Sequence, residues 1–391
     1  MTELGGEGRP PHRVLLVEGS GACEGGAQMM ADELLHRVDP ERFQVQFAGL
    51  SGGPWPDRLR DEGIPVHVTE KGRWRDVRKV ASVAASLADV VREQRIELVH
   101  ASGTDSLLFA SLGARRAKVP FVWTVFDPLV GLSPRRLLTA RRQVTARLLA
   151  ALHPDAVIFG TDRAGERTPL RAGTSTATIL PGIDLARYGH GDGSRARHAL
   201  GIPDGAPVLA TFGRLTFLKS QTDFVRAMER VVREVPGAYG VVCGGEGEAN
   251  YGDDVRSLLS ELGLGERVLL TGFVPDQLKD DIMAAADVVV HLAKRESFGL
   301  AVVEAQAAGR VVVAADASGP RSLIDDGVTG LLVPVGDVDR LAEVLVDLLH
   351  DPARRAELGR RARVASVRHG IEPMVEEIES VWDGVLGAHP A

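Results

Sequence analysis

Short apolar segments alternate with longer amphipathic segments along most of the chain. The apolar segments are rich in Val, Ile and Leu, and the amphipathic stretches between them run for 12 to 18 residues. This alternation is typical of β-α-β units built around a parallel sheet. Because the apolar segments are continuous, helices should cover both faces of each sheet. The expected strands cover residues 13–17, 43–49, 65–69, 97–102, 120–125 and 155–160, and then 207–213, 239–245, 267–273, 287–293 and 310–317.

The alternation occurs twice, once in each half of the chain. Between the halves, residues 181–207 are rich in Gly, Pro and charged residues, as is typical of a linker. We therefore predict an α/β protein with two doubly wound, Rossmann-like domains that face a central cleft, over residues 1–190 and 191–370. A C-terminal helix over residues 371–391 should pack back on the first domain. In such sheets ligands bind beyond the carboxyl ends of the strands, so the functional residues should lie in the strand-to-helix loops.

Composition and charge narrow the functional classes. The chain has 391 residues, 44% of them hydrophobic and 25% charged, as in an ordinary globular protein. Its formal net charge of -7 argues against a nucleic-acid partner, because phosphate contacts need a basic surface. Cys23 and Cys243 lie in different halves and predict neither a disulfide framework nor a zinc site. The N-terminus lacks the apolar core of a secretory signal and no segment is long enough to span a bilayer, so we expect a cytoplasmic protein.

A basic amphipathic helix is expected over residues 132–152, where arginines and leucines are interspersed. Its leucines can pack on the sheet while its arginines face water, which is the more common arrangement. Alternatively, the helix can rest on an anionic membrane or bind an anionic acceptor. Any membrane contact is therefore expected to be peripheral and to involve this segment.

Two glutamates in the second half, Glu296 and Glu304, are separated by seven residues and flank the start of an expected helix at Gly299. The N–H groups at a helix N-terminus are unpaired and partially positive, so the backbone of residues 298–300 is suited to bind a diphosphate. Each carboxylate can accept hydrogen bonds from sugar hydroxyls on either side of the phosphates. Isolated glutamates are usually helix-start or solvated acids, but Glu304 lies in an apolar helix with little exposed face for such an acid.

Arg214 and Lys219 follow the first expected strand of the second half, in the loop before a helix. Both can reach a pyrophosphate, Arg through its planar guanidinium group and Lys as a point charge. A P-loop is excluded because it needs Gly immediately before Lys-Ser, where this chain has Leu218. Basic residues at a helix start are often only solvated, so this assignment depends on the rest of the site.

A glycine-rich loop follows the first strand, with Gly19, Gly21, Gly25 and Gly26 ahead of an amphipathic helix. Such a loop can bring backbone N–H groups against a phosphate or an acceptor. It also approximates a dinucleotide-binding fingerprint, so an NAD-dependent dehydrogenase is an alternative. Two features weaken that alternative: the glycine spacing is one residue too long, and the second strand ends without an acid to bind a ribose.

Taken in order, these segments resemble the retaining family 4 glycosyltransferases of the GT-B fold, the glycosyl transferases group 1. The resemblance covers nearly the whole chain and is most specific over residues 212–334. It implies a nucleotide diphosphate sugar as donor, with the diphosphate bound by Arg214 and Lys219, the transferred sugar by Glu296 and the ribose by Glu304. The other donor-binding residues that it implies are Gly25, Gly26, Gly272, Phe273, Val274, Ser297, Phe298, Gly299 and Leu300, with 272–274 near the base.

The acceptor side departs from the family pattern. Family members commonly carry one His after the fourth strand and another after the fifth, where this chain has Ser102 and Phe126. His100 precedes the first of these places and is expected to be structural. Asp127 is a candidate to orient the acceptor or assist its deprotonation, although an Asp before Pro is more often a turn former. Asp105 is a further candidate of the same kind.

The resemblance also implies retention of the anomeric configuration. Because the motifs contain no protein nucleophile, we expect a front-face reaction in which the leaving diphosphate takes the acceptor's proton while Arg214 and Lys219 stabilise its charge. Glu296 then positions the sugar, and Asp127 completes the candidate catalytic set. No metal or other cofactor is expected to be required, since the only Asp-x-Asp sequence, at Asp337, lies where a helix cap is expected.

The substrates are less closely defined by the sequence. A UDP-linked hexose is expected because such donors are common, and the acceptor should offer a hydroxyl on a small glycoside, a secondary metabolite or a lipid-linked intermediate. The missing histidines leave open a sugar-nucleotide-binding protein without transferase activity. A phosphorylase and a sugar-nucleotide epimerase are further alternatives beside the dehydrogenase.

Overall fold

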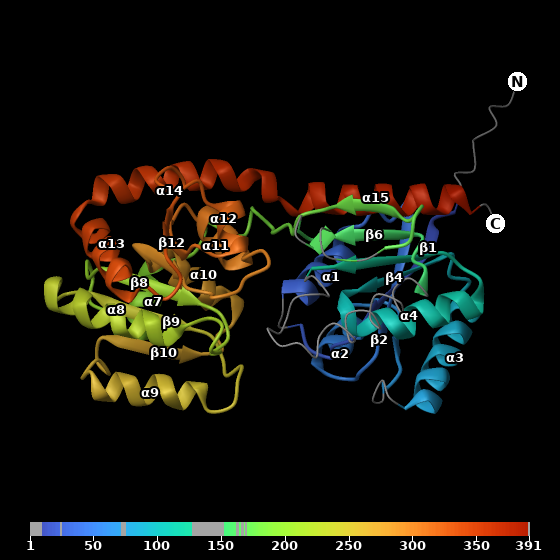
Figure 1. Cartoon of the computed structure of the whole chain (residues 1–391), viewed down its shortest axis with the longest axis horizontal. Helices are drawn as coiled ribbons and strands as arrows, with labels where there is room; N and C mark the ends of the chain where they lie inside the picture. The colour runs from blue at the N-terminus through green and yellow to red at the C-terminus, as the bar shows by residue number, and fades with distance from the viewer. Residues whose placement is uncertain are drawn as a thin grey trace, which may run out of the picture. The chain divides into compact units, whose positions relative to one another are not determined.

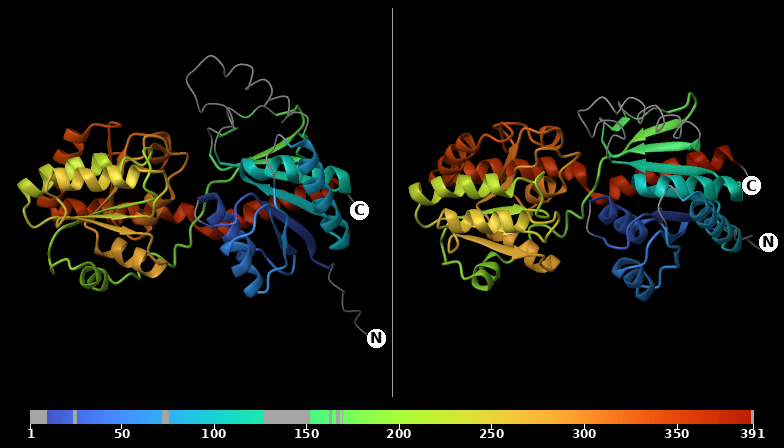
Figure 2. Two further views of the ribbon diagram at one scale, coloured as in Figure 1. Left: turned by 90° about the horizontal axis from the view of Figure 1, so that it is seen from below. Right: turned by 60° about the horizontal axis from the view of Figure 1, so that its bottom comes forward.

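The computed structural model describes residues 10–23, 26–71, 76–126, 152–161, 164–165, 168 and 170–389. Gly25, Asp127 and nearly all of the basic segment 132–152 lie outside the described residues. The chain divides into two units, Met1–Gly182 together with Ile371–Ala391, and Ile183–Gly370. Each unit has its own parallel sheet with helices on both faces, which confirms the α/β class expected from the sequence (Figures 1 and 2).

The first sheet has the strand order β3-β2-β1-β4-β5-β6-β7, and all neighbouring strands are parallel. The order runs outward from β1 in one direction and from β4 in the other, so the sheet has its switch point between these two strands. A crevice at such a point is the usual ligand site of a doubly wound sheet. The strands are β1 (His12–Glu18), β2 (Phe43–Gly49), β3 (Val66–Val68), β4 (Leu98–Ser102), β5 (Phe121–Val125), β6 (Ala156–Phe159) and β7 (Ser175–Thr178).

Both faces of the first sheet are buried, which explains why its central strands are apolar throughout. Along β1, Val14 and Leu16 pack in one cluster while Leu15 and Val17 pack in another. Successive side chains of a strand point to opposite faces, so each cluster covers one face. The first cluster includes side chains of α1 (Gly26–Arg37), α2 (Pro54–Asp61) and α15 (Ile371–Ala388), and the second those of α3 (Val77–Glu93) and α4 (Gly103–Ala117).

Helix α15, from the far end of the chain, is built into the core of the first unit. Trp382 is fully buried, and its indole N–H donates to Nδ1 of His100 at 3.2 Å. The other ring nitrogen of His100 then donates to Thr124 at 2.7 Å. Burial lowers the pKa of His100 to about 3, so the ring is neutral. The imidazole therefore joins β4, β5 and α15, in agreement with the structural role expected for it.

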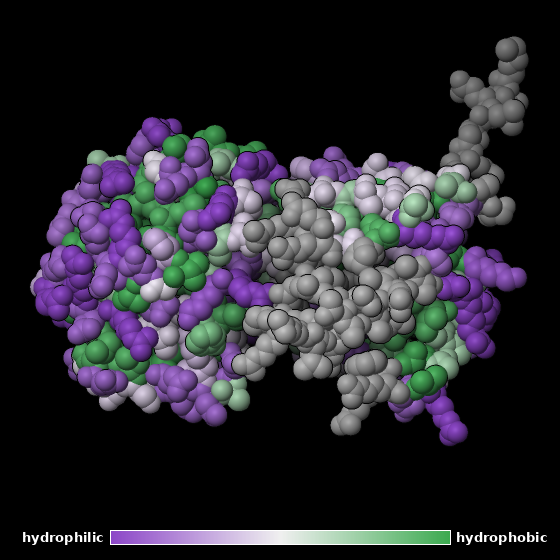
Figure 3. Space-filling model, viewed as in Figure 1, coloured by the Kyte–Doolittle hydropathy of each residue, from purple (hydrophilic) through white to green (hydrophobic). Residues whose placement is uncertain are grey.

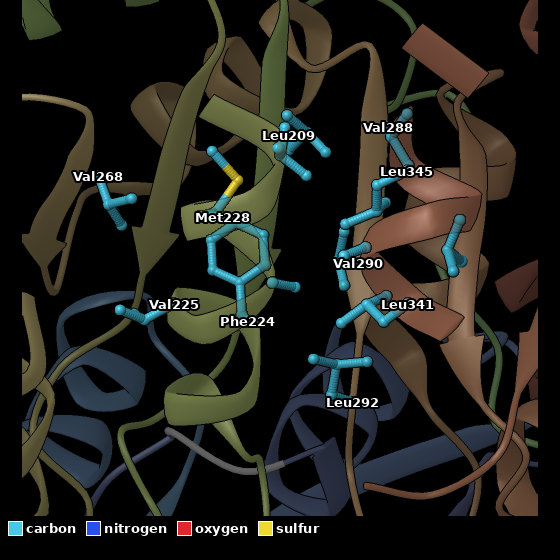
Figure 4. Packing of buried hydrophobic residues seen from close by; sticks show 14 of the residues in the cluster. Leu209, Phe224, Val225, Met228, Val268, Val288, Val290, Leu292, Leu341 and Leu345 are labelled. Atoms are coloured by element: carbon cyan, nitrogen blue, oxygen red, sulfur yellow. The ribbon is translucent and has the colours of Figure 1, made fainter. Parts of the chain in front are cut away.

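The second sheet repeats this plan with the order β10-β9-β8-β11-β12-β13, and its switch point lies between β8 and β11. Figure 4 shows part of one core layer, where Phe224 and Met228 of α8 and Leu341 and Leu345 of α13 face the sheet. The strands are β8 (Val208–Phe212), β9 (Tyr239–Cys243), β10 (Val268–Gly272), β11 (Val288–His291), β12 (Val311–Ala315) and β13 (Leu331–Val333). The helices are α7 (Gly193–Leu200), α8 (Gln221–Glu234), α9 (Tyr251–Glu261), α10 (Asp276–Ala285), α11 (Leu300–Ala307), α12 (Ser318–Leu323), α13 (Val338–His350), α14 (Pro352–Ser366) and η1 (Val367–His369).

Residues 183–190, at the start of the expected linker, belong to the second unit. Ile183 forms a parallel bridge with Gly370, and its N–H donates to the carbonyl group of residue 369. The Arg187 guanidinium group donates to Asp280 at 2.8 Å and to Asp276 at 3.0 Å, both on α10. These contacts fix the segment to α10 and to the end of the second unit, so the structure draws the boundary at Gly182.

The surface is mixed in character. On the face seen in Figure 3, polar residues cover most of the second unit, and apolar residues form scattered groups. Phe217 and Phe273 are exposed aromatic side chains, with 57% and 82% of their surface accessible. Within the described ranges, no helix is long and apolar enough to cross a membrane.

Candidate functional site

Glycines allow the loops at the switch point of the second sheet to approach one another closely. A Cβ atom on Gly244, after β9, would lie 2.0 Å from the carbonyl oxygen of Gly213, after β8. A Cβ atom on Gly319, at the start of α12, would lie 2.3 Å from the carbonyl oxygen of Phe298. The N–H of Gly319 and the hydroxyl of Ser318 both donate to the carbonyl oxygen of Glu296, at 3.0 and 3.1 Å. The α12 turn therefore fixes the backbone that carries Glu296.

Lys219, Glu296 and His291 form a connected cluster at this switch point. Lys219 follows β8, His291 is the last residue of β11, and Glu296 lies in the loop between β11 and α11. Lys219 Nζ donates to Glu296 Oε2 at 2.5 Å, and His291 Nε2 donates to the same oxygen at 3.1 Å. The structure thus brings two predicted site residues, Lys219 and Glu296, into direct contact.

The cluster keeps Glu296 ionised. Burial by itself raises the pKa of this carboxyl group, but the hydrogen bond from His291 and the charge and hydrogen bond of Lys219 outweigh burial and lower the pKa to about 2. A carboxylate at neutral pH accepts hydrogen bonds and donates none. Glu296 is therefore suited to bind hydroxyl groups and unsuited to act as a general acid.

Arg214 lies in the same loop as Lys219 but remains exposed. Its side chain forms no ion pair within the part of the chain that the structure describes. An unpaired guanidinium group beside a paired lysine gives the loop a net positive character. The loop is therefore suited to bind a diphosphate, as the sequence predicts.

Glu304 is buried on α11, with 3% of its surface exposed. Lys279 of α10 donates to its Oε1 at 2.7 Å, and the Tyr188 hydroxyl also donates to its carboxylate. Burial, and then the charge of Glu304, raise the pKa of Tyr188, so this phenol stays protonated. Glu304 is thus no solvated helix residue, because each of its neighbours is placed to orient it.

Sequence reasoning did not find His291, Lys279 or Tyr188. His291 ends an apolar strand and could have been found from the rule that residues at strand ends face the switch point. Lys279 lies in a run of acidic residues that is indistinguishable from a solvated helix face. Tyr188 lies in the linker, and only the fold shows that this segment reaches α11.

The remaining donor residues predicted in the second half of the chain lie in the second unit. Gly272 adopts φ of 67°, a left-handed conformation that favours glycine, and directs the exposed Phe273 away from the core. Gly299, with φ of 107°, is the N-cap of α11. Phe298 is buried against the His369 ring at 5.5 Å in an edge-on contact. The partly buried residues of the set are Val274, Ser297 and Leu300.

The predicted acceptor-side residues lie in the first unit. Ser102 ends β4 and is buried, and Asp105 lies in the first turn of α4, where Lys71 donates to it at 3.2 Å. The Phe126 ring lies against the backbone of Gly160, where an added Cβ atom would be 2.4 Å from the ring. Asp127 falls outside the described residues. Of the two donor-binding residues predicted in the first half, Gly26 is the first residue of α1 and Gly25 also falls outside the described residues.

The Asp-x-Asp sequence is used as expected. Asp337 is the N-cap of α13, and its side chain accepts a hydrogen bond from the backbone N–H of Arg340 at 3.0 Å. Among the residues described, no group of three or more His, Cys, Asp or Glu side chains is arranged to bind a metal ion.

Known protein families match both halves of the chain. Residues 193–365 match the family model described as glycosyl transferases group 1, and residues 25–175 match the glycosyl transferase 4-like domain. The D-inositol 3-phosphate glycosyltransferase of Kribbella flavida is 33% identical over 339 residues, which cover 81% of this chain and 76% of the relative. The enzyme of the same name from Saccharomonospora viridis is 37% identical over 268 residues. That match covers 65% of this chain and 60% of the relative, so the chain spans well under the full length of some relatives.

Solved structures show the same fold. Anabaena HepE, in complex with UDP and glucose, superimposes with a TM-score of 0.81 at 25% identity, over 95% of this chain and all of that one. Sucrose-phosphate synthase from Thermosynechococcus elongatus superimposes with a TM-score of 0.77 at 20% identity, over 96% of this chain. Together with the match to the Kribbella relative over more than two thirds of both chains, this shows that the chain belongs to the GT-B glycosyltransferases of family 4, the glycosyl transferases group 1.

Proposed function

We propose that the chain transfers a hexose from a UDP-linked donor to a hydroxyl group of a polyhydroxylated acceptor, with retention of the anomeric configuration. The observation that carries the proposal is the contact between Lys219 and Glu296 at the switch point of the second sheet. It supports the proposal because a cation suited to a diphosphate lies beside an ionised carboxylate suited to a sugar. HepE, solved with UDP and glucose, supports the donor. The relatives named for D-inositol 3-phosphate favour a cyclitol phosphate as the acceptor.

In the proposed reaction the bond between the anomeric carbon and the diphosphate oxygen breaks, and a bond from the acceptor oxygen forms on the same face. The acceptor's proton passes to the departing diphosphate. Lys219 and Arg214 stabilise the charge that develops on that leaving group. Glu296 accepts hydrogen bonds from the sugar hydroxyls and fixes the sugar for attack.

Glu304 binds the ribose hydroxyls of the donor in this proposal. Its two neighbours, Lys279 and Tyr188, orient the carboxylate and keep it from turning away. Both carboxylate oxygens have further lone pairs available, so ribose binding does not require Lys279 to leave.

The test is direct detection of transfer. The protein is incubated with UDP-glucose or UDP-N-acetylglucosamine and a panel of acceptors that includes 1D-myo-inositol 3-phosphate, and the product's anomeric configuration is read by NMR. We expect UDP release coupled to an α-linked product, with unchanged turnover in EDTA. Lys219→Met should lower turnover by about 100-fold or more. A β-linked product would refute retention, and near-normal turnover of Lys219→Met would remove the leaving-group role.

A sugar-nucleotide-binding protein without transferase activity is the second candidate. Ser102 and Phe126, at the places where family members commonly carry histidines, favour it. In that case UDP-glucose would still bind, and Lys219→Met would weaken this binding. No acceptor, however, would cause the release of UDP.

A further inference from the structure

The switch point of the first sheet carries a buried acid, Glu18. It is the last residue of β1, and Ser102 is the last residue of β4. The two strands are paired in register up to Val17 and Ala101, so Glu18 and Ser102 lie side by side where the order of the sheet reverses. The same place in the second sheet holds the Lys219–Glu296 cluster, so each sheet presents a carboxyl group at its switch point.

The carboxyl group of Glu18 is incompletely satisfied. Only 2% of the residue is exposed, and its Oε2 accepts the backbone N–H of Gly19 at 2.9 Å. Its Oε1 has no hydrogen-bond partner within the described part of the chain. Burial raises the pKa of Glu18, and the nearby Ser102 and Gln28 side chains and the backbone N–H groups of Gly19 and Ser20 offset this only in part. Leaving a buried acceptor unpaired is costly, so this oxygen is suited to accept a hydrogen bond from a ligand.

The surroundings of Glu18 indicate what that partner is. Lys71 and Asp105 form an ion pair beside the next residue, Gly19: a Cβ atom on Gly19 would lie 3.0 Å from Lys71 Nζ and 2.7 Å from Asp105 Cβ. Because Lys71 is paired with Asp105, its ammonium group is not available as a free cation for an anionic ligand. Ser102 is the N-cap of α4 but makes no side-chain capping bond, so its hydroxyl is not committed to the helix. A carboxyl oxygen beside a hydroxyl suits a polyol hydroxyl and repels a phosphate.

We propose that Glu18 binds a hydroxyl group of the sugar acceptor, with Oε1 accepting the hydrogen bond and the Ser102 hydroxyl beside it. This inference rests on the proposed function and extends it to the acceptor side, where the family's histidines are replaced. Glu18 and Ser102 would then be acceptor-binding residues, and the substrate class that they select is a polyhydroxylated ring, such as a cyclitol.

Glu18→Gln is the central variant, because Gln keeps the shape and removes the strong acceptor. With 1D-myo-inositol 3-phosphate as the acceptor probe, we expect KM for the acceptor to rise about tenfold, as for the loss of one buried hydrogen bond. The Kd for UDP-glucose, measured by calorimetry, should stay within about twofold of the wild-type value. Glu97→Gln is the matched control, since that carboxylate accepts hydrogen bonds from His12 and from the Arg13 N–H. These contacts lie at the N-terminal ends of β1 and β4, away from Glu18.

A set of deoxygenated inositol phosphates separates contact from structure. If Glu18 binds one hydroxyl, the wild-type enzyme loses affinity for the analogue that lacks it, while Glu18→Gln treats that analogue and the parent alike. A loss that is equal for every analogue, or an acceptor KM that is unchanged in folded Glu18→Gln, overturns the inference and leaves the proposed function standing. A wild-type protein that binds no sugar nucleotide refutes the proposed function, and the inference with it.

Discussion

The contact between Lys219 and Glu296 supports a quantitative prediction about stability. The pKa of Glu296 is about 2 in the folded protein against an ordinary value of 4.5. That difference of about 2.5 corresponds to about 3 kcal/mol in favour of the folded state at pH 7. Lys219 and His291 share this stabilisation. We therefore expect Lys219→Met to lower the free energy of unfolding at pH 7 by about half of it, or about 1–2 kcal/mol.

The pH dependence distinguishes an ion pair from packing. Because the folded pKa of Glu296 is lowered, its contribution is complete above about pH 4.5 and is lost as the pH falls through about 2. By the same arithmetic, the contribution falls to about 1 kcal/mol at pH 3. The effect of Lys219→Met should shrink in proportion, to less than about 1 kcal/mol.

Urea unfolding of the wild-type protein and of Lys219→Met at pH 7 and pH 3 provides the measurement. Lys294→Met is the matched control, since its ammonium group lies 4.0 Å from the centre of the Phe217 ring and is paired with no carboxylate in the described structure. Its effect, about 0.5–1 kcal/mol, should be the same at both pH values. An equal effect of Lys219→Met at pH 7 and pH 3 would refute the ion-pair reasoning.

Three further variants test other parts of the second unit. Gly319→Ala should lower the unfolding free energy by about 1–3 kcal/mol and reduce turnover, because the new Cβ atom would lie 2.3 Å from the Phe298 carbonyl oxygen. Thermal unfolding and turnover assays check this, and an unchanged melting temperature would contradict it. Lys279→Met should weaken UDP binding in calorimetry more than binding of 2′-deoxy-UDP, because Glu304 loses a partner; an equal loss for both nucleotides would argue against ribose binding. Phe273→Ala should change the unfolding free energy by less than about 0.5 kcal/mol, because its ring is 82% exposed, while the Kd for UDP rises; unchanged UDP affinity would place the base elsewhere.

The sheets could be predicted from the sequence because their strands are apolar on both faces. β7 escaped prediction for the opposite reason. Its residues Ser175–Thr178 are small and polar, and they lie largely exposed at the edge of the sheet, so no apolar run marks them. The boundary between the units could not be predicted from amino-acid composition either. The linker's Gly and Pro content says nothing of Arg187 binding Asp280, which joins residues 183–190 to the second unit.

The candidate site was predictable in its ligands and not in its internal contacts. Spacing and family resemblance single out Lys219 and Glu296 separately, as groups for a phosphate and a sugar. Their mutual hydrogen bond depends on β8 and β11 being neighbours, which is a property of strand order. Glu18 was missed because a lone acid at the end of an apolar strand carries no motif. Its significance comes from the position of β1 beside β4.

The position of α15 affects the order in which the protein can fold during synthesis. Residues 183–370 form the second unit from one continuous segment, and all of them leave the ribosome before α15 does. Until then one face of the first sheet lacks Trp382 and Ile378, so apolar side chains such as Phe43 stay uncovered. The second unit can therefore complete its core first, and the first unit must wait until α15 has been translated.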